Sequence, residues 1–157
     1  MARLVFTCLR ALQLTLSLAS IGLSGFVVNW YMTVRTSTPS PFTYLIVSSV
    51  FSILSLAYLE LVPRFAPRLS HQYAAIGVES VNAALYFAGF IAVAVFIGSL
   101  LMCQGTVCSA GRADAVVAAG QFTTWIATTI LMAKDMFKRG FEPPVKDVNG
   151  AREMGQV

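Results

Sequence analysis

Four long apolar stretches, separated by short polar or proline-containing segments, dominate the sequence. They cover residues 11–34, 42–62, 73–102 and 115–133. A helix needs about 20 apolar residues to cross the hydrocarbon core of a bilayer. Helices are favoured because a lone strand would leave unpaired backbone in lipid, and a barrel would show alternating short segments. The sequence therefore predicts an all-α, integral membrane four-helix bundle over residues 11–134, flanked by residues 1–10 and a flexible tail over 135–157.

The basic residues predict the orientation of these helices. Nine lysine and arginine residues fall on one side of the predicted membrane and two, Arg35 and Arg112, on the other. Because cytoplasmic loops carry the excess of basic residues, both termini are expected in the cytoplasm. The start of the chain also has features of a signal peptide. Its apolar run continues to Val34, beyond a typical signal sequence, and this favours a membrane span.

Composition narrows the function classes. The chain of 157 residues is 57% hydrophobic and 11% charged, whereas soluble domains are near ~25% charged. The net charge of +4 does not indicate nucleic-acid binding, because the basic residues lie at the ends of apolar runs rather than in one patch. With three cysteines, one histidine and no CxxC motif, we predict no metal, no cofactor and no catalytic residues.

Glu79 is an acidic residue placed well inside an apolar run, and Asn82 follows three residues later on the same helical face. An ionisable side chain in a membrane span is a functional candidate. Because the third stretch begins near Tyr73, we expect Glu79 near the inner headgroup boundary. We interpret Glu79 and Asn82 as polar contacts to a neighbouring helix, with Arg10 or Arg64 as partner. A proton relay is the alternative.

Cys103 and Cys108 share the predicted outer connection, with Gly105 between them. That side of a secretory-pathway membrane is oxidising, and glycine can adopt left-handed conformations that turn a short loop. We predict a disulfide, with two free thiols as the alternative. Quinone-linked four-helix oxidoreductases use CxxC pairs, which this chain lacks. Cys8, beside the first stretch, is either a candidate S-palmitoylation site or an unmodified cysteine.

Small residues recur at helical spacing in all four stretches. Such residues let membrane helices approach closely. They form either the seam inside the bundle or, on one helix, a face for self-association or a partner. The candidate helix-packing residues are Gly22, Gly25, Ser48, Ser52, Ser80, Ala84, Ala88, Gly120 and Thr124.

Several short features occur together between Leu9 and Lys134. They are Leu9-Arg10 followed by Gln13, the pair Glu79 and Asn82, the two cysteines after the third stretch, Arg112, and an alanine-rich start of the fourth stretch. With four spans, this combination resembles the MARVEL-domain family, in particular small fungal members of the eisosome-associated, non-classical-export type. The connection between the cysteines is shorter than in many family members. The resemblance implies a role in organising plasma-membrane or vesicle membranes, without catalysis and without a ligand site.

We therefore expect a non-catalytic, multi-pass protein of the plasma membrane or secretory vesicles that associates laterally with lipids, with other membrane proteins or with itself. One alternative is a small four-helix transporter, which requires an acid near the middle of a span. The other is an accessory subunit of a larger membrane enzyme or channel complex.

Overall fold

The computed structural model describes residues 2–34, 39–65, 72–99 and 105–139. These residues form four helices: α1 (Ala2–Val34), α2 (Ser40–Phe65), α3 (Gln72–Ser99) and α4 (Thr106–Arg139). At 1.5 Å per residue their lengths are about 39–51 Å, which exceeds a hydrocarbon core of about 30 Å. All four are apolar enough to cross a membrane. The described chain is thus all-α, as predicted.

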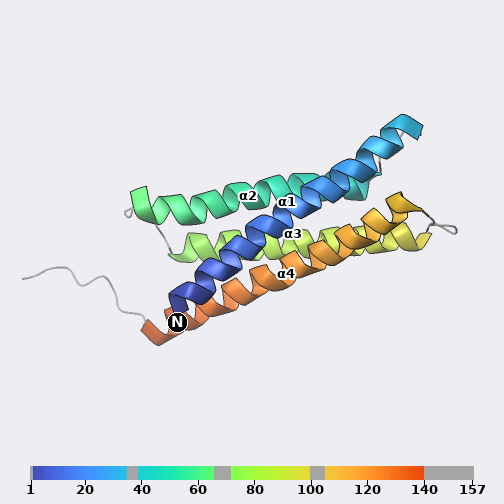
Figure 1. Ribbon diagram of the computed structural model, residues 1–157. Helices are drawn as coiled ribbons and strands as arrows, with labels where there is room; N and C mark the ends of the chain where they lie inside the picture. Colours follow the sequence, from blue (N-terminus) through green and yellow to red (C-terminus); the bar gives the residue numbers. More distant parts are fainter. Residues whose placement is uncertain (1, 35–38, 66–71, 100–104, 140–157) are drawn as a thin grey trace, which may run out of the picture.

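The helices form a bundle in which neighbours in sequence also pack together. α1 lies against α2 and α4, and α3 lies against α2 and, most extensively, α4. The start of α1 lies beside the end of α4 (Figure 1). We call this the N-terminal end of the bundle. The four helices therefore enclose one interior, with α1 and α3 at opposite corners.

Two helices differ most in length from the predicted spans. α1 begins at Ala2, so most of the predicted N-terminal segment is helical. α4 begins at Thr106, nine residues before the predicted span, and ends at Arg139. The charged residues Arg112 and Asp114 therefore lie within the helix and do not mark its start. Gly105 precedes α4 with a φ of 102°, and its carbonyl accepts a hydrogen bond from the Ser109 amide at 3.2 Å. This confirms the left-handed glycine expected there.

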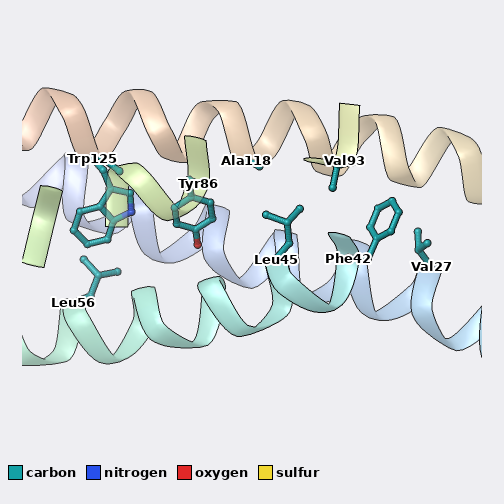
Figure 2. Close-up of a cluster of buried hydrophobic side chains, with 9 residues drawn as sticks. Val27, Phe42, Leu45, Leu56, Tyr86, Val93, Ala118 and Trp125 are labelled. Atoms are coloured by element: carbon teal, nitrogen blue, oxygen red, sulfur yellow. The ribbon is translucent and has the colours of Figure 1, made fainter. Parts of the chain in front are cut away.

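The apolar core is a single file of side chains along the bundle axis. Figure 2 shows it running from Trp125 and Leu56 at one end to Phe42 and Val27 at the other. Other large apolar side chains either pack against this file or are exposed on the outer surface, as happens on all four helices. A bundle with apolar side chains on its outer surface is suited to lipid as a solvent.

Gly89 on α3 permits the closest approach to α2. A Cβ at this position would lie 2.5 Å from Cδ2 of Leu45, a side chain that is itself fully buried. We expect Gly89→Ala to destabilise the bundle by about 1–3 kcal/mol, because Leu45 must leave its packed position.

The matched control is Gly98→Ala, on the same helix, where a Cβ would meet no atom within 4 Å. Thermal unfolding of the two variants in detergent, followed by circular dichroism, measures the difference. Equal stability of the two variants would contradict the close packing of α2 on α3.

Candidate functional site

An ion pair crosses the bundle interior near its N-terminal end. Arg10 of α1 donates from Nη2 to Oε1 of Glu79 on α3. Glu79 is fully buried and Arg10 nearly so. The guanidinium carbon lies 5.5 Å from the ring centre of Phe6 and 5.7 Å from that of Trp125, which is cation–π distance. Because α1 and α3 occupy opposite corners, this pair ties the bundle together across its diagonal.

Amide and hydroxyl groups beside the ion pair form further bonds, and together these contacts involve all four helices. Gln13 accepts from Arg10 at 3.3 Å and donates to Thr128 of α4 at 3.2 Å. Asn82 of α3 donates to Ser55 of α2 at 2.9 Å. We name as the polar layer the set Arg10, Gln13, Ser55, Glu79, Asn82 and Thr128. In lipid, such contacts hold helices together because hydrophobicity alone cannot.

Further hydrogen bonds connect the polar layer to the middle of the bundle. Gln121 of α4 donates to the carbonyl of Gln13 at 2.8 Å and to the Ser17 hydroxyl at 2.6 Å. Ser17 reaches Ser52 of α2 at 3.2 Å. All four of these residues are fully buried. The interior is therefore lined by polar groups that bond mostly to one another.

Asp114 is a second buried carboxylate that sequence reasoning missed. Its two oxygens accept hydrogen bonds from the hydroxyls of Ser20, at 2.8 Å, and Ser24, both on α1. It is fully buried and forms no ion pair within the described ranges. A signal was present, because Ser20 and Ser24 are four residues apart and Asp114, Gln121 and Thr128 repeat every seven residues on one face of α4.

Some of the predicted packing residues lie inside the bundle, and others lie on its outer surface. Ser48, Ser52 and Thr124 are buried, and a Cβ at Gly120 would lie 3.7 Å from Leu16. The stripe on α3 and the glycines on α1 do not lie in the intramolecular seam. Exposed outward are Ser80, Ala84, Ala88 and Gly22, and a Cβ at Gly25 would meet nothing within 4 Å.

The two cysteines among the described residues lie at opposite ends of the bundle. Cys8 is exposed and free near the start of α1. Cys108 is buried in the first turn of α4. Cys103 lies outside the described residues, so its pairing with Cys108 stays a prediction.

The described residues contain no group of three or more metal-ligating side chains. The buried polar residues bond one helix to another, so they stabilise the assembled bundle. Arg10 and Gln13 on one helix, and Glu79 and Asn82 on another, meet in the polar layer. These are residues on which the resemblance in sequence rests.

Comparison with known proteins agrees with this arrangement. The model of the MARVEL family, described as a membrane-associating domain, matches residues 3–131. No curated protein and no solved structure shows significant similarity to the chain. The match spans all four helices and every residue of the polar layer. The chain is a multi-pass membrane protein and belongs to the MARVEL family.

Proposed function

We propose that this protein organises regions of the plasma membrane or of secretory vesicles by lateral association with lipids and proteins, without catalysis. It resembles the small fungal, eisosome-associated members of its family in this role. The observation that carries the proposal is the division of the bundle surface. The acids and amides buried in the spans, with most of their serine partners, turn inward, while most of the outer surface carries apolar and small side chains.

The α3 stripe of Ser80, Ala84 and Ala88 supports lateral contact. These small side chains face outward, where they leave the helix backbone open to close approach by another helix. Glu79 gives no comparable support to a transporter, because Arg10 already holds it.

Native-membrane discs extracted with a polymer, followed by lipid and protein mass spectrometry, test the proposal. We expect membrane-domain proteins or further copies of the chain to copurify, and Ala84→Leu/Ala88→Leu to reduce them. The control Val47→Leu enlarges an exposed side chain on α2 and leaves the α3 stripe unchanged. A stoichiometric large enzyme or channel, unaffected by either change, would instead identify an accessory subunit.

We also propose that both termini face the cytoplasm. The excess of basic residues on that side supports this orientation. Tags at either end are therefore expected to resist protease in sealed, right-side-out vesicles and to be cut after the vesicles are opened. Digestion of either tag in sealed vesicles would contradict the orientation.

A further inference from the structure

Four buried polar atoms in and beside the polar layer have no hydrogen-bond partner among the described residues. They are Oε2 of Glu79, Oδ1 of Asn82, Oε1 of Gln121 and Nε1 of Trp125. Thr128 and Thr129 lie within reach of Glu79, but both hydroxyls donate to the carbonyl of Trp125 instead. The four side chains are each 0% exposed. A buried polar atom in a membrane span costs free energy unless it is paired, so four together require an explanation.

The residues that carry the four atoms are linked through the polar layer. Glu79 is bound by Arg10, whose guanidinium also lies 5.7 Å from the ring centre of Trp125. Asn82 follows Glu79 by one helical turn. Gln121 bonds to the carbonyl of Gln13, one turn from Arg10. The unpaired atoms therefore gather beside the polar layer and do not scatter over the bundle.

Existing hydrogen bonds fix the orientation of the side-chain amides of Asn82 and Gln121. Asn82 Nδ2 donates to the carbonyl of Val78 at 2.8 Å, and Gln121 Nε2 donates to the carbonyl of Gln13 at 2.8 Å. A carbonyl can only accept, so exchanging nitrogen and oxygen in either amide would break a bond. The region thus presents three acceptors, one of them a carboxylate oxygen, and a single indole donor.

This set of groups selects the chemistry of its ligand. An anion is disfavoured because three of the four atoms are acceptors. A cation is disfavoured because the Arg10 guanidinium already occupies the region. A water molecule donates two hydrogen bonds and accepts from an N–H, which fits two acceptors and the indole. We propose that buried water molecules bind here and bridge α3 to α4.

Hydroxyl-radical labelling by X-ray pulses tests the proposal, because radicals form from water at the site where it is bound. The full chain is placed in lipid nanodiscs and labelled positions are identified by peptide mass spectrometry. We expect Trp125 to be oxidised several-fold faster than Phe42, after correction for intrinsic reactivity. Both side chains are buried in the core, and Phe42 lies at the opposite end.

Two variants locate the water. Asn82→Leu removes one acceptor and its bond to Ser55, and we expect oxidation of Trp125 to fall to the level of Phe42. Ser49→Ala also removes a bond between α2 and α3, the one from Tyr86 at 3.2 Å, but leaves the four atoms in place. It is expected to leave oxidation of Trp125 unchanged.

The unsubstituted protein already decides the question, whether or not a variant folds. Oxidation of Trp125 as slow as that of Phe42 would show a dry region and overturn the proposal. Equally fast oxidation of both would show an interior open to water throughout, and would also overturn a specific site. A loss of labelling in Ser49→Ala equal to that in Asn82→Leu would overturn the assignment to these atoms.

Discussion

Replacing Glu79 with alanine is expected to destabilise the protein by about 3–5 kcal/mol, because it leaves Arg10 charged and buried without its partner. Arg10 cannot lose its proton to relieve this cost. The change should appear as a lower detergent concentration at the midpoint of unfolding when SDS is titrated into bicelles.

Two further variants separate charge from packing. Arg10→Met/Glu79→Leu replaces both partners by apolar side chains and is expected to recover most of the stability. Asp135→Ala removes an exposed acid from α4 and is expected to shift stability by about 0.5 kcal/mol or less. A Glu79→Ala variant no less stable than Asp135→Ala would show that the ion pair does not hold the bundle.

The second large effect is expected at Asp114. Replacing both Ser20 and Ser24 by alanine removes the two hydroxyls that bond its carboxylate. We expect a loss of about 3 kcal/mol, because hydrogen bonds to charged groups contribute more than neutral ones and a buried acceptor is left unpaired. The same unfolding titration measures it.

The control for this pair is Thr15→Ala on the same helix. Thr15 is exposed and bonds only to the carbonyl of Leu12 in its own helix, so its loss should change little. Adding Asp114→Leu to the doubly substituted chain is expected to restore stability, since no acceptor then remains unpaired. If the serine pair behaves like Thr15, Asp114 does not dock α4 on α1.

The four helices could be predicted from the sequence because the apolar signal is summed over some twenty residues. An error of a few residues at either end of a span does not change that prediction. The sequence was also sufficient to suggest Arg10 as a partner for Glu79. It failed at Asp114, because a span predicted to begin at residue 115 leaves this carboxylate outside the helix that contains it. A carboxylate can remain inside a span when serines on another helix satisfy it, and these serines lie 94 and 90 residues earlier in the sequence.

The sequence left open which way the stripe on α3 points, for a different reason. α3 is apolar on every side, so spacing alone defines a stripe without telling which way it points. Ser80 follows Glu79 by one residue and is therefore turned about 100° from it around the helix. Glu79 and Asn82 set the inward direction, and the residues that share it are Tyr86 and Val93.

The diagonal ion pair can form in a newly made chain only after both Arg10 and Glu79 have been synthesised. Arg10 leaves the ribosome 69 residues before Glu79, which at typical rates is about 3–14 s. During that interval α1 holds a positive charge with no counter-ion, and the charge can stay hydrated at the membrane surface. The hydroxyl groups of Ser20 and Ser24 lack their partner for longer, because Asp114 lies on the last helix. In a chain whose synthesis stops before α4, several polar groups on α1 therefore have no partner. These unpaired polar groups distinguish an unfinished chain from a finished one.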